Sequence, residues 1–266
     1  MKRIILVAIA LSLLSSIAPA GAENRPQTGR PTSTEPAKLN AHAQRSFEIN
    51  ERGVTALQSR NFAQAEALFR EALDVDRLNA TAAFNLAGML ITNKKEREAL
   101  PLLKRYADAF PGDASFQARL GDAYFGSEDA KSAIKHYEQA LSIDPKYPAL
   151  TTKLGTLYSL TNELPKATAM FEKALKQNPK DAQALSNLSS LYLADGKPGM
   201  AVTTAKRALQ IKTSANIYVT LGNAYQDLKD DRNALASFQR AQQLGYSDPK
   251  LAKLIEQLES SIERAS

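Results

Sequence analysis

The most constraining feature of the chain is a self-similarity with a period of 34 residues. A column of small residues recurs at spacings of 34, 34, 34, 34 and 33: Gly53, Ala87, Gly121, Gly155, Ser189 and Gly222. Twelve residues after each of these lies an alanine: Ala65, Ala99, Ala133, Ala167, Ala201 and Ala234. A fixed period of this length is typical of stacked supersecondary units, each of which buries its apolar face against its neighbours.

Each unit contains two apolar stripes at helical spacing. The first joins a leucine, a small residue and a large residue, as in Leu120–Tyr124, and the second follows the recurrent alanine, as in Ala167–Ala174. These stripes predict two antiparallel helices, whose small residues allow a close approach while the large ones fill the surrounding space. Prolines are predicted to end the second helices at Pro111, Pro145 and Pro179.

These motifs resemble those of the tetratricopeptide repeat (TPR) family. The L-G-x-x-Y element stands at 120–124 and 154–158, and the A-x-x-x-F-x-x-A element stands at 167–174. The resemblance implies an all-α fold, a right-handed α-solenoid of about six TPR helix-turn-helix repeats with a C-terminal capping helix. It also implies a concave groove, lined by the first helices, that holds extended peptides or partner helices.

The expected domain organisation follows the repeat. It comprises a signal peptide at 1–22, a flexible Pro/Thr-rich tether at 23–45, repeats at 46–79, 80–113, 114–147, 148–181, 182–214 and 215–248, and a capping helix at 249–266. The capping helix has a polar face with Glu256, Glu259 and Glu263, which favours a capped monomer. The structural alternative is self-assembly through uncovered terminal repeats.

The fifth repeat departs from the pattern. It has Ala205 in place of the aromatic residue, Thr213 in place of the proline, and one residue fewer before the sixth repeat. Loss of a core aromatic without compensation costs on the order of 3–5 kcal/mol. We therefore expect a looser or differently angled junction at 211–216. The second repeat also departs, with Tyr106 in an alanine position and Pro101 early in its second helix.

The first 22 residues have the organisation of a secretory signal peptide. Lys2 and Arg3 precede an apolar run over 4–17, and small-residue cleavage patterns end at Ala20 and Ala22. An uncleaved anchor is the alternative, but a membrane span needs roughly 20 apolar residues. The chain has no cysteine, so it has no disulfide and no cysteine for lipid attachment. We expect export to a Gram-negative periplasm, with no membrane span in the mature chain.

Charge and motif patterns argue against several function classes. The net charge is +6, but basic and acidic residues are interspersed without a basic stripe, so nucleic acid is not an expected partner. His42 and His136 have no ligand-spaced partners and are expected to be exposed to solvent. The segment 196–199 is predicted as an interhelical turn rather than a phosphate loop. We expect no enzyme activity, no cofactor and no metal site.

The predicted binding surface is the face of the first helices that points away from the packing columns. Helical geometry assigns to it Asn85, Arg119, Asp122, Lys153, Thr156, Asn187, Ser190 and Asn223. Small and amide side chains leave room for a peptide and can hydrogen-bond its backbone. Arg119 and Lys153 are expected side by side, where they could hold a carboxylate. The open alternative is that Arg119 pairs locally with Asp122.

Together these features predict a non-enzymatic protein-protein interaction scaffold or adaptor of the cell envelope. Its expected partner is an extended peptide or a helix of a cell-envelope protein, held in the concave groove. Similarity to exported TPR adaptors suggests outer-membrane or cell-wall assembly, secretion, pilus biogenesis or delivery of protease substrates. The residues do not choose among these pathways.

Overall fold

The computed structural model describes residues 41–147 and 149–265. Within these ranges the chain forms thirteen helices and no strand. The helices are α2 (Ala41–Gln58), α3 (Phe62–Val75), α4 (Ala80–Thr92), α5 (Glu96–Ala109), α6 (Ala114–Gly126), α7 (Ala130–Ile143), α8 (Leu150–Leu160), α9 (Leu164–Gln177), α10 (Ala182–Ala194), α11 (Pro198–Ile211), α12 (Ala215–Asp227), α13 (Asp231–Gln243) and α14 (Pro249–Ala265). The all-α solenoid class is confirmed, and its right-handed sense stays a prediction.

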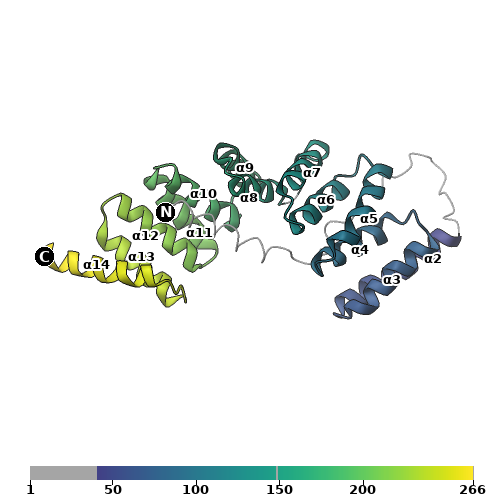
Figure 1. The fold of residues 1–266 in the computed structure, drawn as a ribbon, viewed down its shortest axis with the longest axis horizontal. Coiled ribbons are helices and arrows are strands. Elements are labelled where there is room, and N and C mark those ends of the chain that lie inside the picture. Colours follow the sequence, from purple (N-terminus) through teal and green to yellow (C-terminus); the bar gives the residue numbers. More distant parts are fainter. Residues whose placement is uncertain (1–40, 148, 266) are drawn as a thin grey trace. The chain divides into compact units, whose positions relative to one another are not determined.

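The described residues divide into two compact units. The N-terminal unit ends at Leu150 and the C-terminal unit begins at Thr151, so the division falls at the first residue of α8. Consecutive helices pack in pairs, such as α2 with α3 and α12 with α13 (Figure 1). Each pair then packs on the next one within its unit, for example α3 on α4 and α11 on α12. None of the helices in the described ranges combines the length and apolar character needed to cross a bilayer.

Helix α2 corrects one predicted boundary. It begins at Ala41, so residues 41–45 are helical and do not belong to a flexible tether. No proline follows Pro36 in this region, and Gln44 Nε2 donates to Glu48 Oε1 one turn later at 2.9 Å, which supports an early helix start. The predicted signal peptide and the rest of the predicted tether, up to residue 40, lie outside the described residues.

A small residue facing an aromatic ring sets the distance between the two helices of a pair. A Cβ atom added at Gly121 would lie 2.3 Å from the Tyr137 ring, and one added at Gly222 would lie 2.4 Å from the Phe238 ring. Such distances are shorter than any normal contact between carbon atoms. Glycine is therefore required here by the close approach of the ring, not by an unusual backbone conformation.

Two repeats keep the same interior with other residues. The second repeat has Ala87 and Leu103 at the paired positions, and the fifth has Ser189 and Ala205. All four side chains have no exposed surface. In the second repeat a larger residue on the first helix accompanies a smaller one on the second, so the pair keeps a similar total volume. In the fifth repeat both residues of the pair are small, and the buried Ser189 hydroxyl donates to the Ser186 carbonyl at 2.7 Å.

The departures of the second repeat are also accommodated. Pro101 lies inside α5, which continues through it. The Tyr106 ring packs against Phe116, with centroids 5.6 Å apart, and against Phe110 at 6.2 Å. Its hydroxyl donates to the Arg77 carbonyl at 2.6 Å. A tyrosine in this alanine position therefore joins the second repeat to its neighbours on both sides.

Pairing of the small residue with the ring predicts a compensating double substitution. We expect Gly222→Ala to destabilise the protein by about 1–3 kcal/mol, because the added methyl group overlaps the Phe238 ring. Adding Phe238→Leu recreates the alanine–leucine pair of the second repeat. The double variant should then be more stable than the sum of the single effects predicts.

Denaturant unfolding of the single and double variants measures this coupling. Gly112→Ala is the matched control, because a Cβ atom added at Gly112 meets nothing within 4 Å. Strictly additive single effects would show that the residue pair does not set the helix distance.

The connection between the fifth and sixth repeats lacks the capping seen one repeat earlier. Before α10, Asp181 Oδ1 accepts the amides of Gln183 and Ala184, both at 3.0 Å, and Oδ2 accepts the Thr152 hydroxyl at 2.7 Å. Before α12, the side chain of Ser214 makes no capping hydrogen bond. This contrast supports the looser junction at 211–216, which stays a prediction.

Unequal capping predicts unequal responses to alanine. We expect Asp181→Ala to cost about 0.5–2 kcal/mol, since it removes a helix cap, and Ser214→Ala to cost much less. In the unaltered protein, hydrogen exchange should be faster for the amides of Asn216 and Ile217 than for those of Gln183 and Ala184. Equal protection at the two helix starts would contradict the looser junction.

Candidate functional site

The polar face of the first helices begins in the N-terminal unit with two asparagines. Asn85 Nδ2 in α4 donates to Asn50 Oδ1 in α2 at 3.0 Å. Asn50 is buried, whereas Asn85 is half-buried. Asn85 Oδ1 accepts no hydrogen bond from any residue that the structure describes. Asn85 therefore links two repeats and still offers an acceptor to a partner.

Packing holds the Arg119 side chain of α6 in place. Its guanidinium lies 4.1 Å from the centroid of the Phe84 ring and covers Gly88, both in α4. Nη1 is 3.9 Å from Asp122 Oδ2. The ion pair between Arg119 and Asp122, which the sequence left open, is therefore present, at a distance too long for a hydrogen bond. The guanidinium makes no hydrogen bond to a described residue, and only 14% of the side chain is exposed. Its N–H donors are thus held in position, and its one ion-pair partner in the described chain is Asp122.

Asp122 connects the same face to the second helix of its repeat. The buried Tyr137 hydroxyl, in α7, donates to Asp122 Oδ1 at 2.7 Å. Burial raises the pKa of Tyr137 well above its usual value, and the Asp122 carboxylate raises it further. The phenol therefore stays protonated and remains a donor. Asp122 thus stabilises the α6–α7 pair, and its predicted contact with a partner stays a prediction.

In the C-terminal unit, part of the polar face is bonded to itself. Asn187 Nδ2 in α10 donates to Thr156 Oγ1 in α8 at 3.2 Å, and Asn187 Oδ1 accepts from Gln183 Nε2 at 3.0 Å. Thr156 and Asn187 are only 1% and 3% exposed. The sequence analysis assigned both to an open groove, but the structure buries them, because each satisfies the other across neighbouring repeats.

The remaining predicted site residues of this unit are half-buried. Ser190 Oγ in α10 and Thr220 Oγ1 in α12 are 3.2 Å apart. The side chain of Asn223, in α12, has no hydrogen bond with any other described residue. Lys153 lies in α8, in a different unit from Arg119. The expected placement of Arg119 beside Lys153 therefore stays a prediction.

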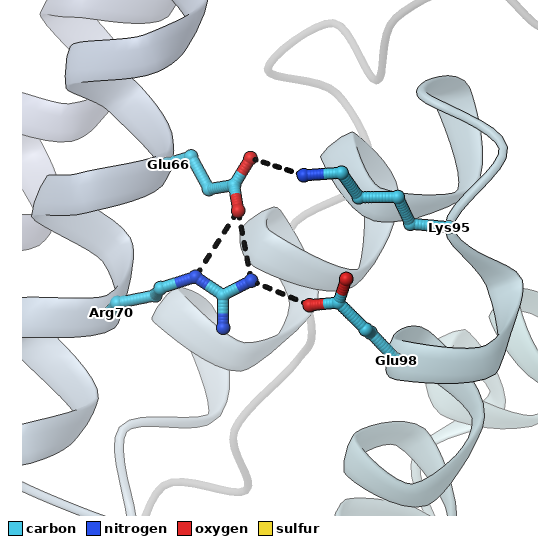
Figure 2. Close-up of polar contacts among 4 residues, drawn as sticks. All are labelled: Glu66, Arg70, Lys95 and Glu98. Carbon is cyan, nitrogen blue, oxygen red and sulfur yellow. Dashed lines mark hydrogen bonds and ion pairs between the residues drawn. The ribbon is translucent and has the colours of Figure 1, made fainter.

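A further polar cluster joins the second helices of the first two repeats. Between α3 and α5, Arg70 donates to Glu66 Oε1 through Nε at 3.1 Å and Nη2 at 2.8 Å, and Nη2 also donates to Glu98 Oε2 at 2.8 Å (Figure 2). Lys95 Nζ lies 3.4 Å from Glu66 Oε2. Four charged side chains thus bridge the first two repeats.

This cluster predicts an acid-sensitive contribution to stability. The hydrogen bond from Arg70, with the nearby Lys95 charge, lowers the pKa of Glu66 below its usual value of 4.5. Its stabilisation is therefore present above pH 4.5 and is lost as the pH falls through the lower pKa of the folded state. Glu66→Gln should cost about 1 kcal/mol or less at neutral pH, because the pairs are near the surface.

Thermal unfolding of the Glu66→Gln variant at neutral and acidic pH tests this expectation. The difference from the unaltered protein should shrink towards zero in acid. Glu71→Gln, an exposed change on the same helix, is the matched control and should show no such trend. A difference that persists unchanged in acid would contradict the role of the Glu66 charge.

His136 is held at the junction of α5, α6 and α7. Its ring stacks on Tyr124 with centroids 5.1 Å apart, and Nδ1 lies 2.8 Å from Gln117 Oε1. It is half-buried, not exposed as predicted, and burial lowers its pKa. His42 is exposed, as predicted. The described ranges contain no group of three His, Cys, Asp or Glu residues that could hold a metal ion.

A crevice in the C-terminal unit was not predicted from the sequence. It has a volume of about 730 Å³ and lies between α9 and α11, with residues of α10 also lining it. The available signal was a run of small residues in the fifth repeat, including Gly199 and Thr203. That signal was read only as an interhelical turn and a weak junction.

Sequence comparisons identify relatives over most of the repeat region. Models described as tetratricopeptide repeat match residues 50–114, 95–148, 124–192 and 215–244. The Drosophila melanogaster protein O-mannosyl-transferase Tmtc3 is 31% identical over 94 residues, which are 35% of this chain and 10% of that protein. The chain therefore spans about a tenth of the length of this curated relative.

Several solved structures share the fold. Pseudomonas aeruginosa PilF superposes with a TM-score of 0.70 at 17% identity, covering 83% of this chain and 99% of PilF. PilW, described as a widely conserved type IV pilus biogenesis factor, superposes with a TM-score of 0.66 at 18% identity. The match covers 81% of this chain and 98% of PilW. YrrB, described as a TPR protein with an unusual peptide-binding site, superposes with a TM-score of 0.62 at 19% identity. The match covers 71% of this chain and 97% of YrrB. At these identities the likeness concerns the fold alone.

Proposed function

Since the chain belongs to the tetratricopeptide-repeat family, whose members are generally non-catalytic scaffolds, we propose that it is a protein-interaction adaptor of the cell envelope. It binds an extended peptide or a helix of an envelope protein along the face of its first helices. The predicted signal peptide and the shared fold of a pilus biogenesis factor support an envelope role. We do not assign it a catalytic reaction.

The observation that carries this proposal is the state of Arg119. A guanidinium that packing fixes and no hydrogen bond saturates is a preorganised donor for a carboxylate. Asn85, in the neighbouring first helix, keeps an oxygen that can accept a backbone N–H of the same segment. Preorganisation lowers the entropy lost on binding. The N-terminal unit therefore suits a segment that carries an acidic side chain.

Affinity capture with a single substitution at this position tests the proposal. The full chain is immobilised, envelope extract is passed over it, and the retained proteins are identified and then titrated in purified form. Arg119→Met keeps an unbranched side chain over Phe84 but removes the charge and the donors. We expect it to weaken binding of the retained partner by about ten- to a hundredfold, since a hydrogen bond to a charged group is lost.

The control is Arg97→Met, a change of the same kind at an exposed arginine of α5 that has no partner among the described residues. It should retain the partner fully. Unchanged binding by Arg119→Met, or equal loss with both variants, would overturn the assignment. Asn187 is unsuitable for this purpose, because it is buried and its removal would take away its hydrogen bonds with Thr156 and Gln183. Asn223→Ala asks separately whether the C-terminal unit contributes.

The structural alternative, self-assembly through terminal repeats, has less support at the C-terminal end. Leu251, Ile255 and Leu258 of α14 are at most 7% exposed and pack against the last helix pair, including Phe238. The polar outer side of α14 then faces solvent. A covered end of this kind does not favour end-to-end stacking. A monomeric state stays an expectation.

A further inference from the structure

The crevice between α9 and α11 has an apolar floor and partly apolar walls. Leu188 and Tyr192 of α10 form the floor, and they are 3% and 8% exposed. Leu175 of α9 and Met200 of α11 stand on either side, and Met200 is 48% exposed. A volume of about 730 Å³ falls within the range of pockets that hold small ligands or several side chains of a peptide.

Small residues in the fifth repeat leave this space open. Gly199 and Thr203 stand two positions before and after the recurrent Ala201, and the third repeat has Lys131 and Lys135 at the same two positions. A Cβ atom added at Gly199 would meet nothing within 4 Å. Gly199 therefore adds no side chain to the crevice, in contrast to the lysine at the same position of the third repeat.

Other repeats cover the equivalent floor residue. Tyrosine rings at this position have a cation or a ring over them in three cases: Tyr124 with Lys104 and His136, Tyr158 with Lys166, and Tyr225 with Lys206. Among the described residues, nothing of this kind covers Tyr192. Its hydroxyl instead donates to Glu172 Oε1 at 3.0 Å. Burial, with the adjacent Glu172 carboxylate, raises the pKa of Tyr192 to about 12, so the phenol stays a donor at neutral pH.

Two uncommitted cations stand at the rim. Lys176 of α9 and Arg207 of α11 line the crevice and are exposed, and neither forms a hydrogen bond or ion pair with another residue that the structure describes. Glu172 is the one acid that lines the crevice, and the Tyr192 hydroxyl already engages it. The crevice is thus complementary to an apolar group flanked by carboxylates.

We propose that this crevice is a second peptide-binding site, distinct from the first-helix face, and that it takes a partner segment with a leucine or phenylalanine between acidic residues. The apolar side chain enters between Leu175 and Met200 and removes the floor from water. The flanking carboxylates pair with Lys176 and Arg207. Because the residues involved differ from Arg119 and its neighbours, either site can fail without affecting the test of the other.

Matched synthetic peptides provide the direct test on the full chain. The probe is fluorescein-labelled Gly-Glu-Phe-Leu-Glu-Gly, and its relatives replace both glutamates by glutamine, both glutamates by lysine, or both apolar residues by alanine. Fluorescence anisotropy gives the affinities. In protein labelled at the methionine methyl groups, the Met200 resonance, assigned with Met200→Leu, reports the location. We expect the acidic-apolar peptide to bind about tenfold or more tighter than each relative and to shift Met200.

Two variants separate occupation of the crevice from general attraction by charge. A Cβ atom added at Gly199 or at Gly112 meets nothing within 4 Å. Gly199→Leu adds an apolar side chain at the crevice and should weaken binding about tenfold or more, whereas Gly112→Leu makes the same change in the other unit and should have no effect. Combining Lys176→Glu with Arg207→Glu should abolish binding of the acidic peptide and allow the lysine peptide to bind.

Several results would overturn the proposal: equal affinity for the acidic and glutamine peptides, no binding of the acidic peptide at any concentration, binding that leaves Met200 unshifted, or binding that Gly199→Leu leaves intact. Sedimentation of the same samples identifies a competing occupant. An oligomer that Gly199→Leu converts to a monomer would show that a second copy of the chain fills the crevice, and that result also overturns the proposal.

Discussion

The contact between a small residue on the first helix and a large one on the second is the interaction on which the rest of the structure depends. It fixes how near the two helices lie, and so decides which columns are buried and which faces remain outside. At Gly121 and Gly222 the opposing ring leaves no room for a methyl group. In the second repeat Ala87 on the first helix faces Leu103, which is smaller than the aromatic residue of the other repeats, and both side chains are buried. The interior can therefore tolerate different residues provided that each pair keeps a similar total volume.

Once the helix pairs are formed, binding depends on the residues that lie outside the buried columns. Three places illustrate this. Arg70 and its acidic partners bridge α3 and α5, His136 of α7 stacks on Tyr124 of the first helix α6, and the crevice lies between α9 and α11. The helical framework is the same in each case, and only the side chains at a few outward positions differ. A binding function must therefore be argued from these departures, because the repeat itself is common to many proteins.

The helix pairs could be predicted because their contacts are local: each unit touches itself and its neighbours, and the period states how they correspond. Contacts across neighbouring repeats were harder to predict. Thr156 and Asn187 were placed on an open face, yet they bond to each other, since their exposure depends on how one pair is rotated against the next. The same rotation places the Arg119 guanidinium on Phe84, 35 positions earlier in the chain. The repeat period in the sequence does not determine the angle between one helix pair and the next. The reciprocal change of size at Ala87 and Leu103 was visible in the columns and was missed because each column was read alone.

Both proposed sites use cations to bind carboxylates, and this has a consequence for how an adaptor of this kind would act. Each site alone offers few charged contacts near water, where salt screens attraction over about 10 Å, so each is expected to be weak. A partner that carries two acidic segments could engage both sites, and the second contact would then be intramolecular, with an effective concentration that depends on the linker between the segments. Selectivity would come from the number and spacing of acidic segments on the partner, with the apolar floor at Leu188 and Tyr192 distinguishing them from purely charged sequences. Retention by such a scaffold is therefore a property of the partner's whole acidic region, and no single contact needs to be strong.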